Sequence, residues 1–205
     1  MAQVQANGIT IEYESFGDKA NDTVLLIMGL GAQLTMWPVE FCQELVSRGF
    51  HVVRFDNRDI GLSTKFEAAG MPDMAAIFGA LMSGSKPDSA YTLDDMADDA
   101  VGVLDALGIK HAHIVGASMG GMIAQLVAIN HPTRTLSLTS IMSTTGNPTL
   151  PQAKPEAMAV LMTPAVEGDI EGAIARGMNA WKVIGSPAYP TDDVTLRQWV
   201  SRDVN

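Results

Sequence analysis

Runs of apolar residues along the first two thirds of the chain predict the strands of a sheet. Residues 9–16 alternate apolar and polar side chains, as a strand with one solvent-facing side does. Residues 23–27 form a nearly continuous apolar run, which is typical of a buried parallel strand. The short runs at 51–55, 113–115 and 136–142 are rich in the same residue types. Each of these runs is predicted to be a strand.

Between these runs, apolar residues recur at helical spacing. Residues 37–48 form one predicted helix, which Gly49 ends. Thr92, with Asp95 three residues later, resembles a capping box, and the helix after it ends at Gly108. A third helix follows the next strand, with apolar positions at Met122, Ile123, Leu126, Val127 and Ile129. Strands that alternate with helices predict an α/β fold with a mostly parallel, doubly wound sheet.

The carboxyl-terminal part of the chain has a different pattern. After Ser143, prolines interrupt it at Pro148, Pro151, Pro155 and Pro164. Residues 169–183 and 192–204 then have the periodicity of separate helices, without a convincing strand. The sequence therefore predicts an α/β core at 1–147 and a helical cap or lid segment at 148–205. Such a segment is expected over the carboxyl ends of the strands, where ligands bind in open α/β sheets.

Composition and charge restrict the partners. The 205 residues carry a net charge of −10, and 47% of them are hydrophobic. An acidic protein is repelled by nucleic acid and by anionic membrane surfaces, so neither is expected as a partner. The sequence has no apolar run long enough to cross a membrane, and residues 1–8 lack the basic start and apolar stretch of a secretion signal. We therefore expect a cytoplasmic protein.

The cysteine and histidine positions predict neither a disulfide nor a metal site. Cys42 is the one cysteine of the chain and lies in an apolar helical pattern, so we expect it to be a buried packing residue. The four histidines and this cysteine do not cluster at the spacing of metal ligands.

The clearest chemical motif is a G-x-S-x-G pattern at residues 116–120, between a predicted strand and a predicted helix. A strand that turns this sharply into a helix strains the backbone of its apex residue and exposes that side chain, as in a nucleophile elbow. Gly116 and Gly120 are required because side chains there would collide. Ser118 is therefore the candidate nucleophile. The alternative is a serine flanked by glycines by chance, which the neighbouring strand and helix disfavour.

Acyl transfer also requires backbone N–H groups that bind the oxyanion. In a nucleophile elbow the residue after the nucleophile supplies one of them, here Met119. The turn at 28–31 follows a buried strand and contains Gly29 and Gly31, and we assign the second donor to the N–H of Leu30. A dinucleotide-binding loop is the alternative for this turn, but a third glycine and an acidic ribose partner are missing.

Residues 56–63 form a charged turn at the end of another strand. Its aspartates and Arg58 are expected to pair with each other and to shape the loop beside the 28–31 turn. We favour a structural role over a catalytic one, because positioning loops use such pairs more often than chemistry does.

Together, these motifs resemble the α/β-hydrolase family along the whole chain. The elbow at Ser118 and the turns at 28–31 and 56–63 match the patterns of that family in order. Within the family, the chain most resembles aclacinomycin methylesterase-like serine hydrolases, through M-G-x-x, D-x-R-D-x-G-x-S and G-x-S-M-G. The resemblance implies hydrolysis of a small-molecule carboxylic ester through an acyl-serine intermediate, without a metal or an organic cofactor.

Ser118 needs a general base, and we expect none of the four histidines to provide it. His113 begins the strand that ends at Ser118, which puts it roughly 16 Å away at ~3.3 Å per residue. His111 lies farther still, and His51 opens another strand and so points to the same far edge. His131 is at the distant end of the helix that follows the elbow, about 20 Å away at ~1.5 Å per residue.

The family resemblance also places the missing groups. In α/β hydrolases the acid and the histidine follow later strands, which have no counterpart up to residue 205, and residues 143–150 contain no Asp or Glu. We therefore expect the chain to be the amino-terminal part of a longer hydrolase and to be inactive alone. A missing carboxyl-terminal segment or a partner chain would complete the sheet and the triad. The alternative is a non-catalytic binding module that lacks a complete triad.

Overall fold

The computed structural model describes residues 1–70, 76, 79–80, 83–85, 87–147, 149–151, 153–163 and 168–204. Two of the predicted chain-breaking prolines, Pro148 and Pro164, lie outside the described residues. The chain divides into two compact units, Met1–Thr145 and Gly146–Asn205. The roles of core and cap that the sequence suggests for the two parts of the chain stay predictions.

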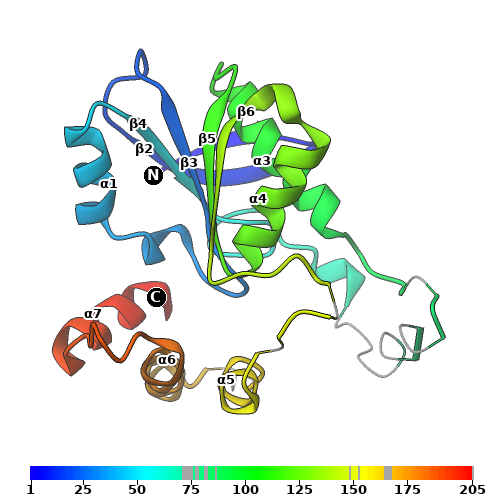
Figure 1. Ribbon diagram of the computed structural model, residues 1–205, viewed down its shortest axis with the longest axis vertical. Coiled ribbons are helices and arrows are strands. Elements are labelled where there is room, and N and C mark those ends of the chain that lie inside the picture. Colours follow the sequence, from blue (N-terminus) through cyan, green and yellow to red (C-terminus); the bar gives the residue numbers. More distant parts are fainter. Residues whose placement is uncertain are drawn as a thin grey trace. The chain divides into compact units, whose positions relative to one another are not determined.

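A six-stranded sheet is the centre of the first unit, in the order β1-β2-β4-β3-β5-β6 (Figure 1). The strands are β1 (Ala2–Ala6), β2 (Ile9–Phe16), β3 (Thr23–Ile27), β4 (His51–Phe55), β5 (Ala112–Ala117) and β6 (Thr135–Ile141). β2 pairs antiparallel with β1 and with β4, and the pairs from β4 through β3 and β5 to β6 are parallel. The predicted α/β class with a mostly parallel sheet is confirmed.

Different helices cover the two faces of the sheet, because side chains along a strand point alternately to opposite sides. Leu25 and Ile27 of β3 belong to the core cluster shared with α3 (Leu93–Ala106) and α4 (Met119–Asn130). Leu26, between them, belongs to the cluster that contains Cys42 of α1 (Val39–Ser47). Figure 1 shows α1 on one face and α3 and α4 on the other. Both faces of β3 are therefore buried, which explains its apolar run.

The capping box predicted at the start of α3 is present. The Thr92 N–H donates to Asp95 Oδ2 at 2.7 Å, and the Asp95 N–H donates to Thr92 Oγ1 at 3.3 Å. These two bonds satisfy donors that a helix start otherwise leaves free, and they fix where α3 begins.

The second unit consists of the helices α5 (Pro155–Leu161), α6 (Ile170–Ile184) and α7 (Asp193–Val204). Ile174 of α6 packs with Leu196 and Val200 of α7 to form its buried core. The Asp169 side chain caps α6 by accepting a hydrogen bond from the Gly172 N–H at 2.8 Å. This unit contains no strand in its described residues.

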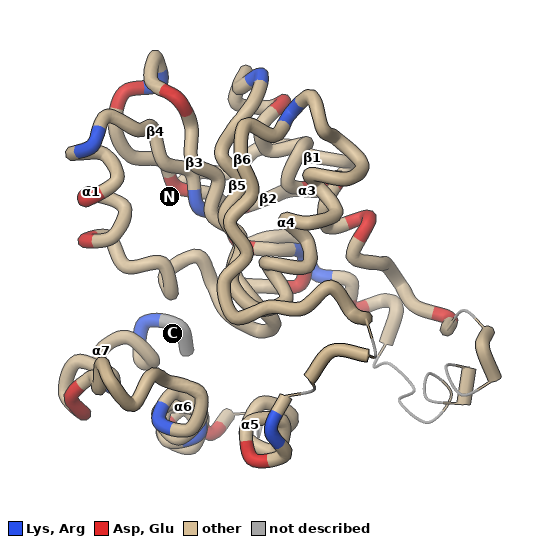
Figure 2. Tube along the Cα trace, in the orientation of Figure 1, with Lys and Arg blue, Asp and Glu red and all other residues tan. Residues whose placement is uncertain are grey.

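Charge is spread over the molecule. Acidic and basic residues are interspersed over the loops and helices of the described chain (Figure 2). No described helix combines the length and the apolar character that a membrane span requires.

Three elements differ from the sequence-based expectation. β1 was not predicted, although its hairpin turn carries an Asn7-Gly8 pair, in which both residues have positive φ (48° and 78°). α1 begins only at Val39, after a short 3₁₀ turn at Leu34–Met36, because Pro38 cannot continue that turn. α5 was also not predicted, because the prolines at 151 and 155 indicated a chain break, whereas Pro155 is in fact the first residue of this helix.

Candidate active site

Ser118 lies at the apex of the turn between β5 and α4. Its backbone has φ 56° and ψ −122°, a strained conformation for a residue with a side chain. The Ser118 N–H donates to the carbonyl of Ile141 in β6 at 2.9 Å, which ties the apex to the edge of the sheet. The serine is half-buried, and no described residue forms a hydrogen bond with its Oγ. This is the geometry that the elbow motif predicts.

The two glycines of the motif allow this turn to close. A Cβ on Gly116 would lie 1.9 Å from the carbonyl oxygen of Gly120, and a Cβ on Gly120 would lie 2.2 Å from that of Ile27 in β3. Neither position could hold a side chain without moving the backbone. The predicted requirement for small residues at 116 and 120 is therefore confirmed.

The turn after β3 lies directly against the serine. A Cβ on Gly29 would be 3.0 Å from the Cβ of Ser118 and 3.5 Å from its Oγ, so a larger residue would crowd the nucleophile. The pairing of Ile27 with Gly116 brings this turn beside the elbow, because it aligns the carboxyl ends of β3 and β5. Leu30 and Met119, the two predicted oxyanion donors, follow Gly29 and Ser118 in the chain. Their catalytic role stays a prediction.

The 56–63 turn supports the 28–31 turn through hydrogen bonds that the sequence did not reveal. Asn57 Nδ2 donates to the carbonyl of Met28 at 2.9 Å. The carboxylate of Asp56 accepts from the N–H groups of Leu34 at 2.7 Å and Leu62 at 3.2 Å. Asn57 and Asp56 are both buried, so these bonds fix the loop firmly.

The predicted pairing of the aspartates in this turn with Arg58 is wrong. The carboxylate of Asp56 is already bound by backbone N–H groups, and Arg58 instead binds Asp99 of α3 in a bidentate pair at 2.6 and 2.7 Å. Burial by itself would lower the pKa of Arg58, but the hydrogen bonds to Asp99 and the charge of Asp99 outweigh it, so the pKa of Arg58 is raised. The guanidinium is therefore permanently charged and neutralised inside the protein.

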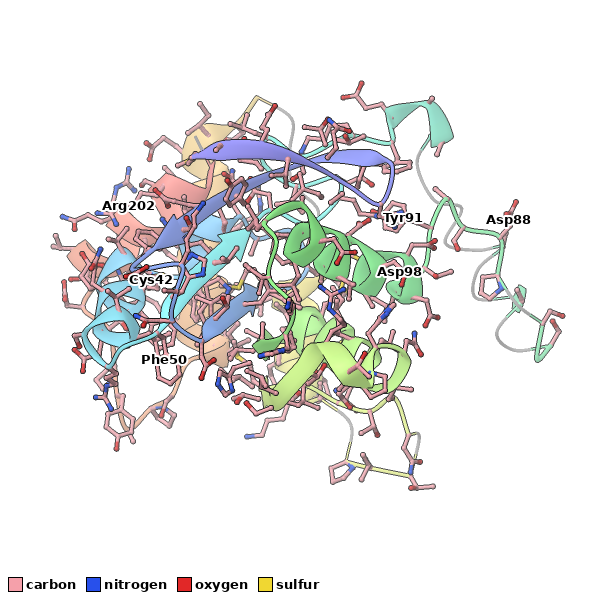
Figure 3. The ribbon with its side chains drawn as sticks, turned by 90° about the horizontal axis from the view of Figure 1, so that it is seen from above. Cys42, Phe50, Asp88, Tyr91, Asp98 and Arg202 are labelled. Carbon is pink, nitrogen blue, oxygen red and sulfur yellow. The ribbon has the colours of Figure 1, made fainter. Side chains whose placement is uncertain are left out.

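Asp59 has a separate partner. Its Oδ2 accepts a hydrogen bond from the hydroxyl of Tyr91 at 2.6 Å, and its Oδ1 accepts from the Phe66 N–H at 2.6 Å. Burial, together with the bond to Asp59 and its negative charge, raises the pKa of Tyr91 to about 12. Tyr91 lies just before α3 (Figure 3) and keeps its proton at neutral pH.

The four histidines lie away from Ser118, in agreement with the sequence analysis. His51 Nδ1 lies 3.0 Å from Thr23 Oγ1 at the amino ends of β4 and β3, and His113 Nδ1 lies 2.8 Å from Oγ of Ser137 in β6. His131 follows the carboxyl end of α4 and contacts Asp98 at 2.7 Å. His111 directly precedes the amino end of β5, and Ser118 is at the carboxyl edge of the sheet, so none of the four imidazoles reaches it.

The other candidate chemical groups are accounted for. Cys42 is fully buried on α1, and burial raises the pKa of its thiol to about 11, so the predicted packing role is confirmed (Figure 3). Among the described residues, His, Cys, Asp and Glu side chains form no cluster that could hold a metal ion.

A cavity of about 450 Å³ adjoins the two predicted oxyanion residues in the first unit. Its lining includes Leu30 and Met119, together with Tyr91 just before α3 and Leu93 and Met96 in the first turn of α3. A volume of this size falls within the range of small-molecule sites. The elbow, the 28–31 turn and the cavity together form the candidate active site.

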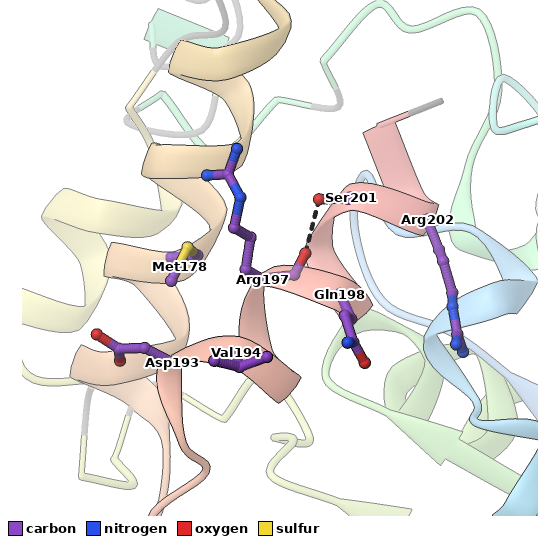
Figure 4. Close-up of a pocket in the computed structure, with 7 residues that line it drawn as sticks. All are labelled: Met178, Asp193, Val194, Arg197, Gln198, Ser201 and Arg202. Carbon is purple, nitrogen blue, oxygen red and sulfur yellow. Dashed lines mark hydrogen bonds between the residues drawn. The ribbon is translucent and has the colours of Figure 1, made fainter.

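The helical unit has a cavity of its own, of about 590 Å³ (Figure 4). The Arg197 side chain there binds Glu171 at 2.7 Å, and the Ser201 hydroxyl donates to the backbone carbonyl of Arg197 at 2.7 Å. These groups are used in holding α6 to α7 and in the helix itself, so we assign this cavity no chemistry.

Comparisons with known proteins agree with this architecture. The family model of the alpha/beta hydrolase fold matches residues 22–178. Rhodomycin D methylesterase DauP of a Streptomyces species is 30% identical over 210 residues, which cover 93% of this chain. Rhodomycin D methylesterase DnrP of Streptomyces peucetius is 31% identical with the same coverage. The chain belongs to the α/β-hydrolase fold family, and the predicted resemblance to methylesterases is confirmed. It spans 64% of the length of each of these two relatives.

Solved structures share the fold. The meta-cleavage product hydrolase CumD of Pseudomonas fluorescens matches with a TM-score of 0.68 at 19% identity, and the match covers all of this chain and 64% of that one. The enol-lactonase of Burkholderia xenovorans matches with a TM-score of 0.59 at 20% identity, covering 99% of this chain and 72% of that one. Both likenesses support the α/β-hydrolase fold of this chain.

Proposed function

We propose that this chain belongs to a serine hydrolase that cleaves small-molecule carboxylic esters through an acyl-serine intermediate. The strained apex at Ser118, packed against Gly29 of the neighbouring turn, is the observation that carries this proposal. It presents a hydroxyl at the carboxyl edge of the sheet, next to the 28–31 turn. The names of the two methylesterase relatives support an ester as the substrate.

In the proposed mechanism, Ser118 Oγ attacks the carbonyl carbon of the ester and transfers its proton to a general base. The backbone N–H groups of Met119 and Leu30 bind the oxyanion of the tetrahedral intermediate. The intermediate collapses, the alcohol leaves with the proton from the base, and the acyl group stays on Ser118. A water molecule, deprotonated by the same base, then releases the carboxylic acid and restores the serine.

We further propose that the base and its carboxylate partner come from outside these 205 residues, on a further segment or on a partner chain. The positions of the four histidines support this, because each lies at the amino edge of the sheet or beyond the far end of α4. The helical unit would act as a cap in that enzyme. A location in the cytoplasm stays a prediction. The alternative, a binding module without a triad, differs in having no reactive serine.

A fluorophosphonate probe tests the proposal on the protein as its gene encodes it. We expect one covalent adduct on Ser118, found by mass spectrometry of the peptide, and loss of labelling in Ser118→Ala. Ser186→Ala, at an exposed serine of the helical unit, is the matched control and should label normally. Turnover of p-nitrophenyl esters should fall at least ~10³-fold in Ser118→Ala alone. A Ser118 that stays unlabelled would favour the binding module.

A further inference from the structure

The cavity of about 450 Å³ beside the 28–31 turn is lined by both apolar and polar residues. Ile60, Leu93 and Met96 contribute apolar side chains. Arg58, Asp59 and Tyr91 contribute polar ones. What the cavity can bind depends on whether these polar groups are free to meet a ligand.

Both oxygens of the Asp59 carboxylate are already bound within the protein. The Tyr91 hydroxyl donates to Oδ2 and the Phe66 N–H donates to Oδ1, each at 2.6 Å. Asp59 also has a positive φ of 67°, which the loop maintains through the bond from the Asp59 N–H to the carbonyl of Thr64. The carboxylate is therefore fixed toward Tyr91 and Phe66.

The Arg58 guanidinium is likewise already bound within the protein and is not available to a ligand. Its guanidinium binds Asp99 with two hydrogen bonds, and only 6% of the residue is exposed. The rings of Phe66 and Tyr91 lie 5.2 and 5.0 Å from its central carbon, so aromatic carbon covers the charge. The positive charge is thus neutralised and shielded before any ligand arrives.

We infer that this cavity is a subsite for an uncharged, apolar part of the ester substrate, and that Tyr91 determines this specificity by holding Asp59 away from the ligand. The inference rests on the proposed function for its connection to Ser118. A ligand with a free carboxylate would lose its hydration and find no available cation among the described residues that line the cavity, while the charge of Asp59 would repel it. An apolar ring or a branched alkyl chain has no charge to desolvate and is not repelled by Asp59.

Binding of two matched ketones tests the subsite without turnover. 2-Acetonaphthone has the carbonyl and an apolar ring system, and 6-acetyl-2-naphthoate adds one carboxylate to the same skeleton. Calorimetry with the Ser118→Ala protein should give at least ~10-fold tighter binding of the uncharged ketone, because the charged one pays for desolvation. Equal binding of the two ketones would overturn the inference.

Three variants place the binding in this cavity. Leu93→Trp, and independently Ile60→Trp from the 56–63 turn, should fill it and weaken binding of the uncharged ketone at least ~10-fold. Tyr91→Phe frees one oxygen of Asp59 and should weaken it several-fold, and Tyr189→Phe, at a tyrosine that is 84% exposed, should leave it unchanged. Circular dichroism checks that each variant is folded. Unchanged binding in both folded tryptophan variants would overturn the inference.

Failure of the subsite and failure of the proposed function give different results. If the ketone pair is discriminated but Ser118 never reacts with the fluorophosphonate, the subsite stands and the hydrolase does not. If Ser118 reacts but the ketones bind equally, the hydrolase stands and the subsite is elsewhere.

Discussion

At the scale of single residues, the contacts around Ser118 stabilise a backbone conformation that is unfavourable for serine. A serine at φ 56° is disfavoured by about 1–3 kcal/mol, and surrounding structure must enforce it. Here the Ser118 N–H is bound to Ile141, and the two flanking glycines allow the helix and the strand to approach within a distance that no side chain would permit. The sequence was sufficient to predict this, because only glycine meets such a demand.

His51 permits a prediction on pH. It is 1% exposed, and burial, followed by the charge of Lys19, lowers its pKa from 6.5, although Asp18 acts in the opposite direction. The unfolded chain therefore binds a proton on this imidazole more readily than the folded protein does. Its contribution to stability is complete above pH ~6.5 and is lost as the pH falls below that value.

We expect His51→Gln to reduce the decline in unfolding free energy between pH 7 and pH 5, because glutamine can still bond to Thr23 and does not titrate in this range. The contribution of His51 to the slope is at most ~1.4 kcal/mol per pH unit. Urea titrations at several pH values measure it. The exposed His111→Gln is the control, and a pH dependence of the same size in His51→Gln and in the wild type would refute the prediction.

At the scale of elements, the sequence predicted local features such as strand bounds well, and it missed contacts between residues far apart in the chain. β3 and β4 were predicted at their observed bounds, because a short apolar run of this length between turns is typical of a buried strand. The partner of Arg58 was missed because Asp99 lies 41 positions away, on another element. One signal was present: Asp99 interrupts the apolar face of α3 between Met96 and Val103, where a charge requires a buried partner.

The Arg58–Asp99 pair should be a main link between the 56–63 turn and α3. Removing one partner of a buried ion pair leaves the other charge without compensation, so Asp99→Ala should lower the unfolding free energy by about 3–5 kcal/mol. Asp99 also accepts from Asn7 Nδ2 at 2.9 Å, and that bond would be lost as well. Denaturant titration measures the change.

The exposed Arg48–Glu44 pair of α1 provides the control, since its side chains are 67% and 61% exposed. Glu44→Ala should cost no more than ~0.5 kcal/mol. The double variant Arg58→Met with Asp99→Leu should recover part of the loss, because it leaves no lone charge. Equal effects of Asp99→Ala and Glu44→Ala would contradict the proposed link.

At the scale of the whole molecule, β6 is an edge strand of the sheet whose apolar side chains are partly exposed. β6 is the last strand in the order and pairs only with β5 among the described strands. Leu136 and Leu138 are 43% and 42% exposed, although they alternate along the strand as residues of one face do. The sequence predicts an apolar strand at 136–142 and, from the absence of later strands up to residue 205, an unpaired edge beside uncovered apolar surface.

An exposed apolar edge strand promotes association, because its free backbone groups can pair with a second copy. Leu138→Lys should therefore raise the highest concentration at which the 205-residue chain is still monomeric. Sedimentation velocity measures this limit. Thr139→Lys adds the same charge to the adjacent position without removing apolar surface, so it should help less. If β6 were already protected from association, neither lysine would change the sedimentation profile. A gain with Thr139→Lys equal to that with Leu138→Lys would assign the effect to charge alone and not to the exposed leucines.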